Sequence, residues 1–435
     1  MAEIFPFAAL RYNPQKVRLQ DVITQPYDKI SPQMQQDYYE ASPYNLVRII
    51  LGQPHGAETE RDNRYTQAAA YLKSWMREGV LSQDNSPSIY AYSQKFNIPG
   101  TNRTVERRGF IATGRLHEYS EKIVFRHEQT LAKPKSDRLN LLRATRAHFG
   151  QIFMLYSDPA QSIDSLLFDD DHYAWQQVLD EYGVEHRIRR ISEPAILNIV
   201  QTEMADRKLI IADGHHRYET ALNFRNELAV SKAANSLSVG AQAAMMTFVN
   251  MDSPGLVILP THRVVHGLND FDAEQFLARA RDSYDVKAVE LGNTEEIKSA
   301  LAESGKKTNS FVAAITNRLY LLAARPGASD RLPGEFSSRQ RRLDVVHLHA
   351  LILEQLLGIS REQITNQQHI RYLRDAGEAL EQARNDSAVN VAFLMNPVSI
   401  EQVREIAFSG EVLPQKSTDF FPKLLSGLAI YLLDG

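Results

Sequence analysis

The chain has 435 residues, of which 43% are hydrophobic and 23% charged, and its formal net charge is −4. This is the composition of an ordinary globular protein, long enough for more than one domain, and its acidic balance argues against general nucleic-acid binding. The absence of cysteine excludes disulfides, thiolate metal sites and cysteine nucleophiles. Because no apolar run reaches membrane-spanning length and no signal-peptide pattern is present, we expect a cytoplasmic protein that does not contact membranes.

The first third of the chain predicts an alternation of strands and helices. The apolar run at residues 46–51 predicts a buried strand, and the amphipathic spacing at 61–79 predicts a helix. Residues 89–96 and 108–116 predict an antiparallel hairpin, because a Pro-Gly turn signal lies between them.

A polar, mostly basic stretch at residues 125–138 leads into a predicted helix at 139–147. Its basic side chains could neutralise a polyphosphate, while His127 and Glu128 could hold a metal ion or transfer a proton. The alternative is a solvated loop whose internal ion pairs contribute little. The candidate phosphate-binding residues here are Lys133, Lys135 and Arg138.

The densest polar motif follows an apolar run at residues 209–212 and reads Asp213, Gly214, His215, His216, Arg217. The pattern predicts a strand, a tight turn and a helix. An anion is favoured there because the first N–H groups of a helix lack intrahelical partners, and an arginine can grip a phosphate with two donors. The alternative is structural, with an aspartate N-cap, a glycine turn and two solvated histidines.

The second half predicts further elements and two more polar segments. Residues 160–205 are expected to be mostly helical, 230–240 to form a loop, and 243–249 to form a buried strand. A strand at 256–263 ends in Thr261, His262 and Arg263. Residues 311–322 predict a hairpin, 343–357 a helix and 389–395 a strand.

The carboxyl-terminal residues 410–423 form a proline-bounded loop that contains Lys416 and Ser417 and could close over a site, before an apolar strand at 428–433. The whole pattern predicts an α+β protein with mixed sheets and flanking helices. We expect an N-terminal segment at 1–84, a central domain at 85–270 with the Asp-Gly-His-His-Arg motif, and a C-terminal domain at 271–435.

These motifs together resemble a widespread prokaryotic family known as domain of unknown function 1015, a resemblance that implies no reaction. It extends from the first to the last part of the chain. The resembling stretches are residues 7–12, 26–28, 42–45 with Arg48, 127–130, 133–135 with Asp137 and Arg138, 213–218, 261–263, 416–418, Pro422 and Lys423.

A second, local resemblance covers about a dozen residues. Residues 213–217 with Ala221 are similar to the signature of the ParB/sulfiredoxin-like superfamily, some of whose members resemble kinases that phosphorylate free serine with ADP or ATP. The resemblance implies a strand-loop-helix phosphate site in which the 213–217 backbone and Arg217 bind phosphates. It also implies that Asp213 or a histidine binds magnesium or transfers a proton. The sulfiredoxin cysteine has no counterpart here.

Three functions follow as hypotheses. The first is a nucleotide-dependent phosphotransferase that acts on a small hydroxylated metabolite such as free serine. It would use ATP or ADP with Mg²⁺, with Glu128, Asp213 and His215 in catalytic roles and Asp213 and His127 as metal ligands. The residues assigned to the nucleotide are Gly214, His216, Arg217, Lys133, Lys135, Arg138, Thr261, His262, Arg263, Lys416 and Ser417.

The second hypothesis is a metal-dependent hydrolase, in which His216 and Glu219, three residues apart on a helix, share a metal ion. The third is a non-enzymatic protein that senses nucleotides or binds a partner. All three expect small-molecule ligands, and the sequence leaves homo-oligomerisation open.

Overall fold

The computed structural model describes residues 1–54, 56, 58–128, 133–169, 174–230, 239–290 and 292–434. Its contacts divide the chain into two units. Unit 1 consists of Met1–Arg126, Thr130–Val257 and Pro422–Gly435, and unit 2 of His127–Gln129 and Ile258–Phe421. Each unit therefore combines segments that are far apart in the sequence. Among the residues that the structure describes, no helix is both long and apolar enough to cross a bilayer.

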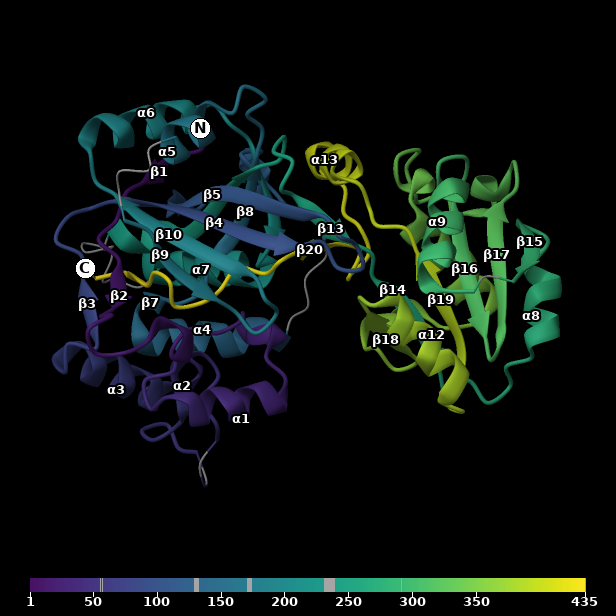
Figure 1. The fold of residues 1–435 in the computed structure, drawn as a ribbon, viewed down its shortest axis with the longest axis horizontal. Coiled ribbons are helices and arrows are strands. Elements are labelled where there is room, and N and C mark those ends of the chain that lie inside the picture. The colour runs from purple at the N-terminus through teal and green to yellow at the C-terminus, as the bar shows by residue number, and fades with distance from the viewer. Residues whose placement is uncertain are drawn as a thin grey trace. The chain divides into compact units, whose positions relative to one another are not determined.

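A mixed sheet forms the centre of unit 1 (Figure 1). In the described part of the chain it has nine strands, in the order β6-β11-β8-β12-β5-β4-β10-β9 with β1 beside β5. The pairs β11–β6 and β12–β8 are parallel, and the other pairs are antiparallel. The strands are β1 (Ile4–Phe5), β4 (Ile89–Asn97), β5 (Thr104–Arg115), β6 (Val124–Phe125), β8 (Ile152–Tyr156), β9 (Gln176–Leu179), β10 (Glu185–Ile191), β11 (Leu209–Asp213) and β12 (Ala243–Asn250).

Helices bury the sheet of unit 1 and build a second, smaller core. Apolar residues of α5, α6 and α7 pack on the strands in one cluster, and α2, α3 and α4 form another with two short strand pairs, β2–β3 and β7–β21. The helices are α1 (Pro32–Ala41), α2 (Val47–Ile50), α3 (Arg64–Arg77), α4 (Lys133–Thr145), α5 (Ser162–Phe168), α6 (Pro194–Ala205) and α7 (His215–Val230). The remaining strands are β2 (Leu10–Tyr12), β3 (Leu81–Gln83), β7 (Ala147–His148) and β21 (Tyr431–Leu432).

Unit 2 contains an antiparallel sheet in the order β15-β17-β16-β19-β14-β18. One cluster of buried apolar side chains includes α8 and the helical segment η8, and another includes α9 and α12. The strands of this sheet are β14 (His262–His266), β15 (Tyr284–Val289), β16 (Ser310–Ile315), β17 (Arg318–Ala324), β18 (Ile370–Leu373) and β19 (Val389–Met395). Strands β13 (Val257–Leu259) and β20 (Asp419–Phe421) pair with each other in a separate two-stranded sheet. The helices are α8 (Ala273–Ala280), α9 (Thr294–Gly305), α10 (Asp344–His347), η8 (Leu348–Leu356, a π-helix), α11 (Arg361–Thr365), α12 (Ala376–Asn385) and α13 (Ile400–Ser409).

The α+β class, the mixed sheet and its flanking helices are confirmed. The hairpin of β4 and β5, helix α3, strand β12 and the hairpin of β16 and β17 also lie where the sequence predicts them. The segment expected to be a loop at 230–240 lies largely outside the described residues, which omit 231–238.

Four expectations are wrong. The strand expected at 256–263 is divided into β13 and β14, so His262 and Arg263 begin a strand rather than end one. Residues 46–51 contain the helix α2 rather than a strand, because the Asn45 side chain accepts a hydrogen bond from the Val47 N–H at 2.9 Å and starts a helical turn. The segment 160–205, expected to be mostly helical, also contains β9 and β10, which pair with each other at one edge of the sheet. The last apolar run forms only the two-residue strand β21.

Candidate functional site

The predicted strand, tight turn and helix around Gly214 are present in unit 1. Residues 209–212 of β11 are buried, the register with β8 shifts just before Asp213, and α7 begins at His215. Gly214 has φ 91°, a conformation that residues with a side chain rarely adopt. The N–H of Tyr218 donates to the Gly214 carbonyl at 2.9 Å and closes the first helical turn. The local sequence thus presents Asp213 at the end of a strand.

Asp213 carries two ion pairs. Its Oδ2 accepts from Arg217 Nη2 at 2.6 Å, and its Oδ1 accepts from Lys423 Nζ at 3.2 Å. Burial by itself would raise the pKa of the Asp213 carboxyl, but the charges of Lys423, Arg217 and Lys29 outweigh it and hold this pKa well below its usual range. A carboxylate held ionised in this way is a weak base, and it is suited to fixing cations.

Hydrogen bonds hold the guanidinium of Arg217, and two nearby glycines leave space for it. Besides Asp213, it donates to the Gln151 carbonyl. A Cβ added at Gly214 would lie 3.0 Å from Arg217 Nε, and one at Gly150 would lie 3.4 Å from Arg217 Nη1. Neither glycine has a side chain that would collide with the guanidinium. Arg217 can therefore lie beside the turn, where its hydrogen bonds hold it.

The same arginine lines a cavity of about 70 Å³ in unit 1, the unit 1 cavity. Thr220, at the second turn of α7, also faces it, and the Thr220 hydroxyl has no hydrogen-bond partner among the described residues. The cavity is lined by Pro26, Tyr27, Ile50, Arg138, Leu141, Leu142, Ala147, His148, Phe149, Gly150, Arg217, Thr220 and Ser426.

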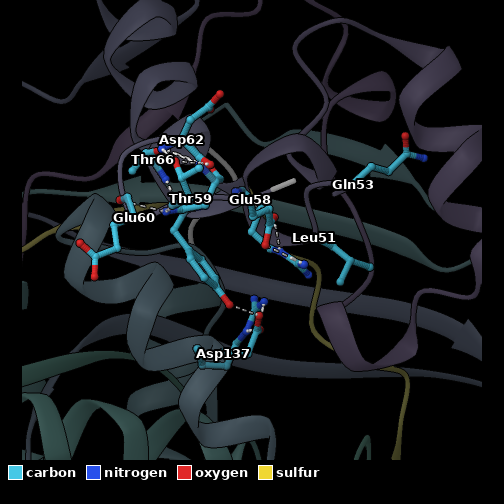
Figure 2. Close-up of polar contacts among 12 residues, drawn as sticks. Leu51, Gln53, Glu58, Thr59, Glu60, Asp62, Thr66 and Asp137 are labelled. Carbon is cyan, nitrogen blue, oxygen red and sulfur yellow. Dashed lines mark hydrogen bonds and ion pairs between the residues drawn. The ribbon is translucent and has the colours of Figure 1, made fainter. Parts of the chain in front are cut away.

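Arg138 brings a second guanidinium to the unit 1 cavity. Its Nε donates to Asp137 at 2.7 Å, its Nη1 donates to the Ile50 carbonyl at 2.7 Å, and it lies 4.2 Å from the ring centroid of Tyr27. The Tyr65 hydroxyl of α3 donates to Asp137 at 2.9 Å and so connects α3 to the start of α4 (Figure 2). These contacts orient Arg138 before any ligand is present.

The other unit 1 candidates are only partly located by the structure. His215 is buried at the start of α7, and His216 is partly exposed beside it. The side chains of Lys133 and Lys135 lie outside the described residues. Glu219 is buried and accepts from the Tyr119 hydroxyl at 3.4 Å. Among the described residues, no group of three or more His, Asp or Glu side chains is arranged to hold a metal ion.

A second set of candidates lies in unit 2, around Thr418. Oε1 of Glu128 accepts from the Thr418 N–H at 2.9 Å and from its hydroxyl at 2.8 Å. The buried ring of His127 places Nε2 2.7 Å from the same hydroxyl oxygen. Thr418 is missing from the site residues predicted from the sequence. Its position in the Ser-Thr pair after Lys416 could have indicated that it belongs to this set.

The Thr-His-Arg segment of unit 2 is buried. Arg263 is 1% exposed and donates from Nη2 to the Lys416 carbonyl at 3.1 Å, and burial lowers the pKa of its guanidinium to about 10. Nδ1 of His262 accepts from the Met395 N–H at 3.1 Å, and burial lowers its pKa to about 4, so the ring is neutral. The Ser417 hydroxyl donates to the Pro414 carbonyl at 2.5 Å.

The predicted residues therefore form two sets rather than one. Asp213, Gly214 and Arg217 meet in unit 1 with Arg138 nearby, whereas the second set belongs to unit 2. The members of the second set are His127, Glu128, Thr261, His262, Arg263, Lys416 and Ser417. Lys423, which the site prediction omits, is a direct partner of Asp213.

Comparison with known proteins places the chain in a family. The family described as "Protein of unknown function (DUF1015)" matches residues 4–346, so the chain belongs to it. No curated protein matches the chain significantly in sequence.

Several solved structures are similar at low TM-scores. A conserved hypothetical protein from Pyrococcus furiosus has 13% identity and a TM-score of 0.35, with 72% of this chain and 93% of that chain covered. A variant of a free serine kinase in complex with ADP has 11% identity and a TM-score of 0.36, with 77% and 96% covered. Truncated SbnI from Staphylococcus aureus has 9% identity and a TM-score of 0.34, with 74% and 87% covered. Similarities this low say nothing about the site, which must be judged on its own residues.

Proposed function

We propose that this DUF1015 protein is a nucleotide-dependent phosphotransferase that acts on a small hydroxylated metabolite, with free serine as the first candidate. One observation carries the proposal. Arg217, fixed beside the Gly214 turn at the N-terminal end of α7, lines the same unit 1 cavity as the guanidinium of Arg138. Two oriented guanidinium groups and a helix N-terminus are a favourable environment for phosphate groups.

Phosphoryl transfer requires mainly positioning and charge neutralisation, which these groups can supply. Thr220 lines the unit 1 cavity, and its buried hydroxyl has no hydrogen-bond partner among the described residues, so a polar ligand there could supply one. In the proposed roles, the 213–217 backbone, Arg217 and Arg138 bind the phosphates of ATP or ADP. The ionised Asp213 is the proposed Mg²⁺ ligand, and it would exchange its contact with Arg217 or Lys423 for the metal ion.

In the proposed reaction the proton acceptor is His215, at the start of α7 in unit 1. Glu128 and His127, which the sequence suggests for proton transfer and metal binding, belong to unit 2, where Oε1 of Glu128 accepts two hydrogen bonds from Thr418, and the proposed reaction does not use them. Lys133, Lys135 and His216 are further proposed nucleotide contacts, whereas Thr261, His262, Arg263, Lys416 and Ser417 belong to unit 2 and are not used by the proposed function.

Nucleotide sensing without turnover is the second candidate. It is favoured by the strongly lowered pKa of Asp213, because the carboxylate next to Arg217 is a weak base. Both candidates require the residues of the unit 1 cavity to bind the phosphates of a nucleotide, and they differ only in whether a phosphoryl group is transferred.

Calorimetric titration of the full chain with ADP and ATP, with and without MgCl₂, tests the binding step. We expect Arg217→Ala to weaken binding about 10- to 100-fold, because a charge-assisted phosphate contact is lost. Arg143→Ala is the matched control, since Arg143 forms an exposed pair with Glu227 and does not line the cavity. The proposal fails if neither nucleotide binds or if Arg217→Ala binds as tightly as the control.

The transfer step is tested separately with free serine and a panel of other hydroxylated metabolites. Phosphorus NMR would show a new phosphomonoester together with the nucleotide product. Binding that depends on Arg217, without a phosphomonoester from any member of the panel, would instead support sensing.

A further inference from the structure

Unit 2 has a large polar cavity that the proposed function does not use. Its volume is about 600 Å³, within the range of cavities that bind small molecules. It lies between the end of α9, the short helix η7 (Gln340–Arg342), the start of α10 and the segment that leads into α13. The charged residues that line this unit 2 cavity are Arg263, Lys306, Lys307, Arg341, Arg342 and Asp344.

The charges around this cavity are five cations and one carboxyl group. Arg341 donates only to main-chain carbonyls, those of Ser329, Leu332, Pro333 and Phe336, so no carboxylate neutralises it within the described residues. In the same part of the chain, the Lys307 ammonium has no hydrogen bond or ion pair. The cavity therefore has an excess of positive charge.

The remaining two surface cations have partners that a ligand can displace. Lys306 pairs with Glu303, and Arg342 pairs with Glu405 at 2.9 Å. More than half of each of these four side chains is exposed. Exposed pairs of this kind contribute little free energy, so they oppose an incoming anion only weakly.

Arg263 adds a buried cation to the cavity wall. Only 1% of the residue is exposed, and its Nε has no hydrogen-bond partner among the described residues. Its other nitrogens donate to the carbonyls of Thr261 and Lys416 and contact the Met395 sulfur. No carboxylate in the described chain pairs with it. A buried charge without an ion-pair partner is costly, and an anionic ligand would offset that cost.

We propose that the unit 2 cavity binds a small phosphorylated molecule that carries at least two negative charges. The five cations select for charge, and the positive end of the dipole of α13, whose cap Ser399 also lines the cavity, favours an anion there. This site is independent of the unit 1 cavity, and it stands whether or not the proposed phosphotransferase function is correct.

The test uses inorganic pyrophosphate as the probe and the full chain as the protein. Hydrogen exchange measured by mass spectrometry, with and without pyrophosphate, reports locally on peptides that cover residues 305–309 and 396–402. We expect protection of both peptides, and we expect the double variant Lys306→Gln/Lys307→Gln to need about tenfold more pyrophosphate for the same protection. These lysines are at the end of a helix, so the variant should keep its fold.

Two control variants separate the sites. Lys287→Gln removes an exposed lysine of β15 that does not line the cavity, and Arg217→Ala alters only the unit 1 cavity. Both should keep the wild-type protection of the two peptides. The proposal is overturned if pyrophosphate protects neither peptide, if the double lysine variant matches Lys287→Gln, or if Arg217→Ala abolishes the protection. If citrate protected the two peptides as well as pyrophosphate does, the proposal of a phosphorylated ligand would be wrong, and a polycarboxylate would fit the cavity instead.

Discussion

Nζ of Lys423 lies 3.2 Å from Oδ1 of Asp213, although 210 residues separate the two in the sequence. The carboxyl-terminal segment of unit 1 thus supplies a cation directly to the motif at the end of β11. Lys423 is 8% exposed at its side chain, so the pair is largely removed from water. Neutralising one member of such a pair removes a charge that compensates the other in this largely buried setting.

We expect Asp213→Asn and Lys423→Met each to destabilise unit 1, by about 2–4 kcal/mol, and the double variant to lose less than the sum. Urea unfolding followed by tryptophan fluorescence is the measurement. Both tryptophans, Trp75 and Trp175, belong to unit 1, so the signal reports on that unit.

The control for this pair is the exposed pair of Arg143 and Glu227, whose alanine variants should show a coupling energy below about 0.5 kcal/mol. A coupling energy for Asp213 and Lys423 no larger than that of the control would show that the pair contributes nothing specific.

Gly214→Ala should cost more stability than Gly183→Ala. Both glycines have positive φ, 91° and 74°, so both substitutions strain the backbone by about 1–2 kcal/mol. A Cβ at Gly183 meets nothing within 4 Å, whereas one at Gly214 lies 3.0 Å from Arg217 Nε. Urea unfolding of the two variants should therefore differ, and Gly214→Ala alone should weaken nucleotide binding. Equal losses in both assays would mean that Arg217 moves freely away.

His148, which lines the unit 1 cavity, should make unit 1 sensitive to acid. Burial lowers the pKa of His148 to about 4, from an unfolded value of 6.5, so the unfolded chain binds the proton more tightly. The resulting stability is fully present above pH 6.5 and is lost as the pH falls towards 4, by up to about 3 kcal/mol. His148→Gln should flatten this part of the stability profile, measured by tryptophan fluorescence in urea. If the stability of His148→Gln depended on pH between 6.5 and 4 in the same way as that of the wild type, this prediction would be wrong.

Asp344, at the start of α10, should show the opposite pH dependence in unit 2. Burial raises the pKa of this carboxyl to about 6, against hydrogen bonds from Asn309, Asn396 and the Ser310 N–H that lower it. A folded pKa above the unfolded value of 3.8 means that stability is fully present below pH 3.8 and lost as the pH rises through 6.

Asp344→Asn should therefore stabilise unit 2 at pH 8 by about 1–3 kcal/mol and have little effect at pH 4. Hydrogen exchange of the amides of β16 and β19 measures this, because tryptophan fluorescence does not report on unit 2. A variant that exchanges faster than wild type at pH 8 would show that the lost hydrogen bonds outweigh the removed charge.

The local structure around the Asp-Gly-His-His-Arg motif could be predicted from neighbouring residues alone. An apolar run followed by a glycine and a helical spacing was enough to predict β11, the turn at Gly214 and α7, because each depends only on neighbouring residues. The same local reasoning failed at residues 46–51, where apolar content suited a strand and a helix equally, and only packing against α3 and the Asn45 side chain selected the helix.

Which polar residues contact one another could not be predicted in this way, because these contacts join distant parts of the chain. Asp213 contacts Lys423, which is 210 positions away along the chain, and Glu128 contacts Thr418, which is 290 positions away. The periodicity of hydrophobic residues in a sequence does not predict contacts between such distant positions. The structure also assigned the predicted site residues to two different units, and it brought Arg263 to a cavity with four other cations. Such contacts depend on the order of the strands in each sheet and on which charged side chains become buried. Both are properties of the whole fold.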